Sequence, residues 1–177
     1  RGLGDVYKRQ AQPQGTFMSE SAAFLAPLPV TPEVSPLVTR LVEQFAAQWI
    51  DLDNLDAWLA QPGDALLLLC GDPVRYPESL DVAVILPELC KALVAQHGCH
   101  LRLGVGRRAA EEALAERFAL RRWPSIIWLR DGGYVTQIDG MRDWDVYLRM
   151  ASSALQQSNA LIPVLSASAA PAPGGCQ

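Results

Sequence analysis

The sequence predicts an α/β protein in three layers, with a central mixed sheet flanked by helices. Apolar runs of strand length alternate with helical patterns, and right-handed crossovers then make the first strands parallel. The run at 65–70 (ALLLLC) is continuously apolar, which is typical of a strand covered on both faces. Asp131-Gly132-Gly133 separates two alternating apolar stretches and indicates a hairpin that adds an antiparallel edge.

The composition indicates one domain with extensions. The chain has 177 residues, half of them hydrophobic, and a net charge of -4, which argues against a general nucleic-acid binder. No apolar run reaches the roughly 18 residues that span a bilayer. We expect a flexible N-terminal extension (1–35), a folded domain (36–157) and a disordered Ala- and Pro-rich tail (158–177). Met18 is a candidate initiator, which would make residues 1–17 non-native.

The first half of the domain begins with a helix. Ser35-Pro36 is typical of an N-cap followed by the first helical residue. The apolar face of this helix is predicted to be Leu37, Leu41, Val42, Phe45 and Trp49. Ile50 then starts a short strand, a short helix covers 53–59, and the buried strand occupies 65–70.

The second half continues the alternation. Residues 71–81 form a predicted loop, followed by a helix at 82–96 with Pro87 inside it and Gly98 as its stop. A strand at 101–105, an amphipathic helix at 109–118 and strands at 125–129 and 134–138 come next. The last helix is capped near Asp143, and its apolar stripe is Trp144, Tyr147, Leu148, Met150 and Ala151. We expect Trp144, Tyr147 and Leu148 to lie in the core.

Pro124 directly precedes the predicted strand at 125–129. Proline donates no ladder hydrogen bond, so it belongs at the entrance of a strand, and X-Pro is the bond at which a cis geometry costs little. Pro124 therefore either starts the strand or builds a backbone turn that a ligand uses.

The four cysteines show no catalytic or metal-binding spacing. Cys70, Cys90, Cys99 and Cys176 include no C-x-x-C pair, and no Cys/His set has zinc-finger spacing. We expect structural or surface thiols, with no metal site and no cofactor.

The element order resembles the thioredoxin fold. That family has a cis proline before the penultimate strand, here Trp123-Pro124, a glycine hairpin, a glycine before the last helix (Gly140) and a kinking proline in the second helix (Pro87). The resemblance implies active cysteines at positions 79 and 82, where this chain has Ser79 and Val82. Because thiol–disulfide exchange needs a thiolate and a resolving thiol, we expect no such chemistry.

A narrower resemblance is to the thioredoxin-like hydrogenase expression proteins of the HyaE/HupG type, which also lack the C-x-x-C motif. It is carried by Asp72-Pro73-x-Arg75-x-Pro77-Glu78, by Glu116-Arg117-Phe118 followed by Arg122-Trp123-Pro124, and by Gly140-Met141-x-x-Trp144. The resemblance implies a cytoplasmic, non-enzymatic chaperone in [NiFe] hydrogenase maturation. Its partner would be the small-subunit precursor with its twin-arginine signal peptide, bound before export.

The resemblance also implies a binding edge beside the cis proline. The residues expected to bind the partner are Asp72, Arg75, Tyr76, Glu78, Asp81, Arg122, Trp123 and Pro124. The carboxylates of Asp72, Glu78 and Asp81 would meet the twin arginines, or alternatively would only cap the loop and helix terminus. Tyr76 and Trp123 are the candidate hot-spot aromatics.

Two further interpretations remain open. Arg121 and Arg122, enlarged by Arg75, Arg107 and Arg108, form a basic patch that is either solvated or meets an acidic region of a second maturation factor. The alternative function is a thiol-dependent oxidoreductase that uses a single cysteine, for which Cys99-His100 is the only candidate pair.

Overall fold

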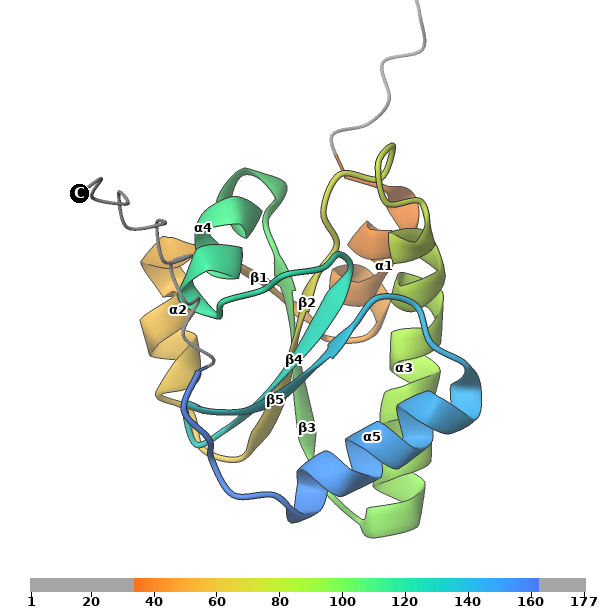
Figure 1. Cartoon of the computed structure of the whole chain (residues 1–177), viewed down its shortest axis with the longest axis vertical. Coiled ribbons are helices and arrows are strands. Elements are labelled where there is room, and N and C mark those ends of the chain that lie inside the picture. Colours follow the sequence, from red (N-terminus) through yellow and green to blue (C-terminus); the bar gives the residue numbers. More distant parts are fainter. Residues whose placement is uncertain (1–33, 163–177) are drawn as a thin grey trace, which may run out of the picture. The chain divides into compact units, whose positions relative to one another are not determined.

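The computed structural model describes residues 34–162, which contain a five-stranded sheet in the order β1-β3-β2-β4-β5 (Figure 1). Strands β1, β3 and β2 are parallel, whereas β4 runs antiparallel to β2, and β5 antiparallel to β4. The strands are β1 Gln48–Ile50, β2 Asp64–Leu69, β3 Leu101–Gly106, β4 Ser125–Arg130 and β5 Gly133–Asp139. The mixed sheet that the sequence predicted is therefore confirmed.

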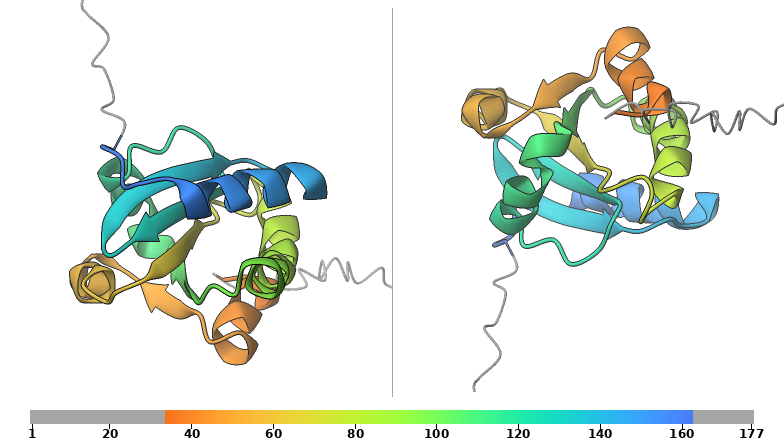
Figure 2. Two further views of the ribbon diagram at one scale, coloured as in Figure 1. Left: turned by 90° about the horizontal axis from the view of Figure 1, so that it is seen from below. Right: turned by 90° about the horizontal axis from the view of Figure 1, so that it is seen from above.

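Five α-helices cover the two faces of this sheet (Figure 2). They are α1 Pro36–Gln44, α2 Leu52–Leu59, α3 Glu78–His97, α4 Glu111–Arg117 and α5 Trp144–Gln156, and a 3₁₀ turn, Arg108–Ala110, leads into α4. Helices α1, α3 and α5 pack on one face with Leu66 and Leu68, while α2 and α4 pack on the other with Leu67 and Leu69. The three-layer, thioredoxin-like fold is confirmed.

Local signals in the sequence explain several element boundaries. The Ser35 hydroxyl accepts a hydrogen bond from the Leu37 N–H, as an N-cap does. Gly98 ends α3 in the left-handed conformation, with a φ of 65°. Asp131 and Gly132 both have positive φ, which is the backbone of a two-residue hairpin turn that matches strand twist.

Several predictions about these elements are wrong. Ile50 is the last residue of β1 and not its first. Trp49 lies in β1, not on the first helix, because α1 ends at Gln44 and Ala46 takes a positive φ. Helix α3 starts at Glu78, four residues before the predicted start, because Pro77 already has helical angles and carboxylates favour a first helical turn. Trp144 is 41% exposed at the first position of α5, so it is not a core residue, whereas Tyr147 is fully buried.

The predicted extension and most of the predicted tail lie outside the described residues. Asn159 and Ala160 lie beyond α5, where the Asn159 amide donates to the Arg130 carbonyl and the Ala160 N–H donates to the Tyr134 carbonyl. Asp143 occupies the N-cap position of α5, although its side chain makes no capping hydrogen bond. In the range 34–162, no helix is long and apolar enough to cross a membrane.

Candidate partner-binding site

The candidate site lies where β2 ends and β4 begins. Leu69 of β2 is paired with Ser125 of β4, which brings the residues before β4 beside Cys70 and Gly71. The Trp123–Pro124 peptide bond is cis, and Pro124 is buried. Pro124 is anchored through its carbonyl, which accepts a 2.7 Å hydrogen bond from the Gly140 N–H.

The positions of the redox cysteines are buried and carry no thiol. Ser79 and Val82 lie in the first two turns of α3 and are 0% and 1% exposed. Burial raises the pKa of the Cys70 thiol far above its usual range and raises the pKa of Cys90 to about 12. Burial also raises the pKa of Cys99. A nucleophilic thiolate is therefore disfavoured at all three described cysteines.

These pKa values predict slow thiol chemistry. With Cys176 replaced by serine, we expect Ellman's reagent at pH 8 to modify Cys70 and Cys90 at least about 100-fold more slowly in the native protein than in urea. The reason is that a pKa of about 12 leaves only on the order of one thiol in 10⁴ ionised at that pH. Mass spectrometry of the labelled peptides identifies the site, and rapid native labelling of Cys90 would contradict the expectation.

Two aromatic rings form a platform above Gly71. The rings of Tyr76 and Trp123 are stacked, with centroids 6.3 Å apart and an interplanar angle of 29°. Gly71 has a φ of 74°, and a Cβ atom there would lie 2.8 Å from the Tyr76 ring and 3.0 Å from the Trp123 ring. Only glycine allows this conformation and this close approach. The Arg75 guanidinium lies 5.6 Å from the Tyr76 ring centroid, on the edge of the platform.

This platform forms part of a surface groove of about 490 Å³. The groove is lined by Tyr76, Glu78, Arg121, Arg122, Trp123, Asp139, Gly140, Met141 and Arg142. The structure thus brings together four of the predicted residues: Tyr76, Glu78, Arg122 and Trp123. Sequence reasoning missed the contribution of Met141 and Arg142, because only the fold brings the start of the last helix beside the cis-proline loop.

The groove carries both signs of charge. Arg121, Arg122 and Arg142 make no ion pair with any described residue, and the same holds for Glu78. Asp139 accepts a 2.8 Å hydrogen bond from the Ser125 hydroxyl.

The other predicted charges lie away from the groove. Asp72 accepts a 2.8 Å hydrogen bond from the Val74 N–H and lies 3.7 Å from the Arg108 guanidinium. These are the contacts expected if Asp72 only caps its own loop and does not bind the twin arginines. Asp81 is exposed in the first turn of α3 and does not line the groove. Arg107 pairs with Asp51, and neither Arg107 nor Arg108 extends the basic patch of Arg121 and Arg122.

The backbone of Trp123 is open. Its N–H and C=O have no hydrogen-bond partner in the part of the chain that the structure describes. On either side the backbone is engaged, because the Arg122 carbonyl accepts from the Ser125 hydroxyl at 2.7 Å and the Pro124 carbonyl accepts from Gly140. The N–H and C=O of this one residue are therefore presented for pairing beside the aromatic platform.

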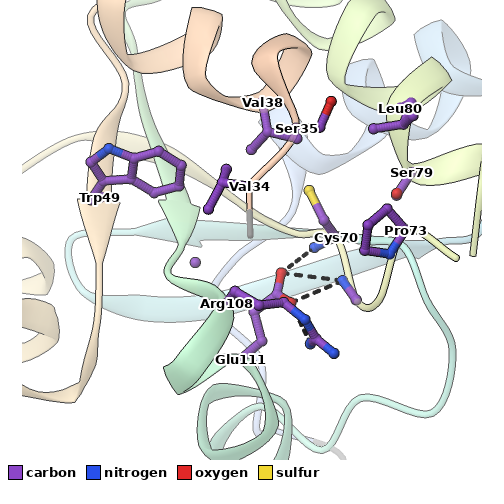
Figure 3. A pocket seen from close by; sticks show the side chains of 12 residues that line it. Val34, Ser35, Val38, Trp49, Cys70, Pro73, Ser79, Leu80, Arg108 and Glu111 are labelled. Carbon is purple, nitrogen blue, oxygen red and sulfur yellow. Dashed lines mark hydrogen bonds and ion pairs between the residues drawn. The ribbon is translucent and has the colours of Figure 1, made fainter. Parts of the chain in front are cut away.

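A buried carboxylate supports the turn beneath this platform (Figure 3). Glu111 at the start of α4 is 1% exposed and accepts hydrogen bonds from the Cys70 N–H at 2.6 Å and the Gly71 N–H at 3.1 Å. It also pairs with Arg108 at 3.0 Å. Burial raises the pKa of Glu111, although the two N–H groups and Arg108 lower it in part. Glu111 thus holds the Cys70–Gly71 turn in place.

No signal in the sequence identifies Glu111. Glu111 and Glu112 stand together at the start of a short amphipathic helix, where carboxylates are ordinarily solvated. Only the packing of α4 against the end of β2 distinguishes the buried Glu111 from the exposed Glu112. Among residues 34–162, no group of three or more His, Cys, Asp and Glu side chains could hold a metal ion.

The family model and the sequence relatives agree on one family. The family model described as "Hydrogenase-1 expression protein HyaE" matches residues 37–147. The hydrogenase expression/formation protein HoxO of Cupriavidus necator is 48% identical over 85% of this chain and 96% of its own length. HupG of Rhizobium leguminosarum is 36% identical over 77% of this chain and 90% of its own length. A crystal structure of hupG from Rhodopseudomonas palustris is 29% identical, covers 62% of this chain and 95% of its own, and superposes with a TM-score of 0.43.

Proposed function

The chain belongs to the HyaE family of hydrogenase expression proteins, and from this premise we propose that it is a non-enzymatic assembly factor for [NiFe] hydrogenase maturation. Its partner is the small-subunit precursor, which it binds in the cytoplasm together with the twin-arginine signal peptide, before export. The names of the related proteins support the role in hydrogenase maturation.

One observation carries the choice of surface: the open backbone of Trp123 lies beside an aromatic platform and a groove. An extended segment of the precursor would pair with the N–H and C=O of Trp123 as an added strand, and one of its side chains would lie on the Tyr76 and Trp123 rings. Because positions 79 and 82 carry no thiol, this edge of the protein cannot perform thiol–disulfide exchange. Binding of a partner segment is the function that it retains.

The charges suggest how the twin arginines are recognised. Glu78 is the predicted carboxylate that lines the groove, and Asp81 lies one turn further along α3. A guanidinium bound by a carboxylate forms charge-assisted hydrogen bonds, which are stronger than neutral ones. The three arginines on the groove would repel a purely cationic peptide, so we assign the signal-peptide arginines to the side of Glu78 and Asp81.

Calorimetric titration of the full chain with a synthetic twin-arginine signal peptide tests this assignment. We expect Glu78→Ala to weaken binding about tenfold, because a partly desolvated charged hydrogen bond is lost. Glu78→Gln keeps the shape and should show a similar loss, whereas Asp72→Ala should bind as the wild type does, because Asp72 is engaged with its own loop.

A peptide with two lysines in place of the arginines serves as the ligand control. Equal affinity of wild type, Glu78→Ala and Asp81→Ala would overturn the acidic contact. Pull-down of the precursor with and without its leader tests the partner itself, and capture of neither form would overturn the proposed function.

The alternative of a single-cysteine oxidoreductase has less support. It requires a reactive thiolate at Cys99, whereas burial raises the pKa of that thiol. Cys99 also precedes β3, at the opposite end of that strand from Gly106 and the candidate groove.

A further inference from the structure

The sheet has an open edge at the N-terminal half of β3. Strand β1 pairs only with Gly104, Val105 and Gly106, whereas β2 pairs with residues 101–105 on the other side of β3. Residues 101–103 therefore extend beyond β1 with one lateral edge that no described strand covers (Figure 1). Unpaired N–H and C=O groups on such an edge are a template for another strand.

A groove of about 370 Å³ follows this edge. Phe45 at the end of α1 and Val94 of α3 line it on one side of the sheet, and Trp58 of α2 lines it on the other. Val94 is 44% exposed, so it offers an apolar surface on this side of the groove. The groove can thus receive side chains on both faces of an added strand.

Four titratable side chains line this groove, and none of them is a carboxylate. They are Lys91, Arg102, His100 and Cys90. Arg102 lies 5.0 Å from the Trp58 ring centroid and donates to the carbonyls of Trp58 and Gln61, so its hydrogen-bond partners are neutral. Asp131, which acts on Arg102 electrostatically, forms no ion pair with it and does not line the groove. Lys91 lies 5.5 Å from the Phe45 ring centroid and pairs with the exposed Glu88 outside the groove. The charged side chains that line the groove are therefore both cationic, opposite in sign to the net charge of -4 of the whole chain.

We propose that this edge binds an extended acidic segment of a partner protein, which adds to β3 as a further strand along residues 101–103. Its backbone pairs with the open edge, its carboxylates meet Lys91 and Arg102, and its apolar side chains contact Phe45 or Trp58. Charge complementarity selects this occupant over a basic segment, which the same cations would repel.

This surface is separate from the groove beside Trp123. In the sheet, Leu101 is level with Asp64 at the start of β2, whereas Ser125 is level with Leu69 at its end. Asp64 and Leu69 are five residues apart along β2, which is about 17 Å at about 3.3 Å per residue. Both surfaces can be occupied at once, so the two proposals succeed or fail independently.

The probe is an acetylated and amidated peptide of repeated Glu-Glu-Val-Val, which presents carboxylates and apolar side chains on both faces of a strand. It is titrated into the isotope-labelled full chain and followed by amide chemical shifts. We expect the largest shifts at Gln48, Lys91 and residues 100–103. The double variant Lys91→Gln/Arg102→Gln should bind about tenfold more weakly, because two attractive charges are removed. Arg149→Gln is the matched control: Arg149 is exposed on α5, and its loss should leave the affinity unchanged.

Two further peptides keep the test independent of any effect of the double variant on folding. A peptide with N-methyl groups on alternate residues cannot form the strand hydrogen bonds and should not bind, and a lysine–valine peptide should be repelled. The proposal is overturned by the absence of shifts with the acidic peptide, by shifts centred on Trp123, or by equal binding of either control peptide. Self-association of the chain through residues 101–103, seen by sedimentation, would also overturn it.

Discussion

Replacing Glu111 with alanine should lower the free energy of unfolding by about 3 kcal/mol. The carboxylate is buried and satisfies the N–H groups of Cys70 and Gly71 as well as the Arg108 guanidinium. Its removal leaves two buried backbone donors without a partner, and each such donor costs about 1–3 kcal/mol. Urea denaturation of the wild type and the variant, followed by circular dichroism, measures the difference. A loss below about 1 kcal/mol would contradict this role.

Glu111→Gln is the matched control, because it keeps one oxygen for the two N–H groups but carries no charge. Since burial raises the pKa of Glu111, the folded protein holds its proton more tightly than the unfolded chain does. This contribution to stability is present in full at a pH below 4.5, the ordinary pKa of a glutamate. It is lost as the pH rises through the higher pKa that Glu111 has in the folded protein. We therefore expect the stability of the wild type, relative to Glu111→Gln, to fall as the pH rises from about 4 to 7. A difference that does not depend on pH would contradict the raised pKa.

Trp123→Ala should weaken binding of the small-subunit precursor about 30-fold, which corresponds to about 2 kcal/mol. Trp123 is half-buried, stacks on Tyr76 and lines the groove, so alanine removes the larger of the two aromatic surfaces on which a bound segment would lie. Aromatic side chains of this kind commonly supply the largest share of the binding energy at an interface. Calorimetry of the full chain with the purified precursor measures the change.

Two variants control this experiment. Trp123→Phe keeps a ring on the platform and should lose only a few-fold in affinity, because offset stacking with Tyr76 is retained. Val74→Ala changes a neighbouring loop residue that is 81% exposed and does not line the groove, so it should bind as the wild type does. If Trp123→Ala retains the wild-type circular dichroism spectrum and binds within twofold of the wild type, the groove is not the binding surface.

Much of the fold could be predicted from local patterns in the sequence. The continuous apolar run of β2 indicates burial on both faces, and residues 65–69 are indeed buried to 1% exposure or less. Asp131 and Gly132 indicate a hairpin because both tolerate positive φ. The errors fall at element boundaries, as at Pro77, where a proline is compatible both with a loop and with the first turn of a helix.

The candidate site was predictable in part. Trp123 and Tyr76 were each identified as candidate hot-spot aromatics, and the structure stacks them with their centroids 6.3 Å apart. Glu111 and Arg142 were missed because each is charged and lies where a solvated side chain is expected. Their roles depend on neighbours that are far away in the sequence: Glu111 bonds to residues 40 and 41 positions before it.

By itself, the sequence determined the layers of the fold and the absence of a C-x-x-C motif, because strand and helix periodicity and residue identity are local properties. It also indicated the position of the cis-proline loop. Only the tertiary structure decided which charges face the groove, that Asp72 is engaged with its own loop, and that β3 extends beyond β1. Each of these depends on the register of strands and the packing of helices, which bring distant residues together in a way that no local pattern encodes.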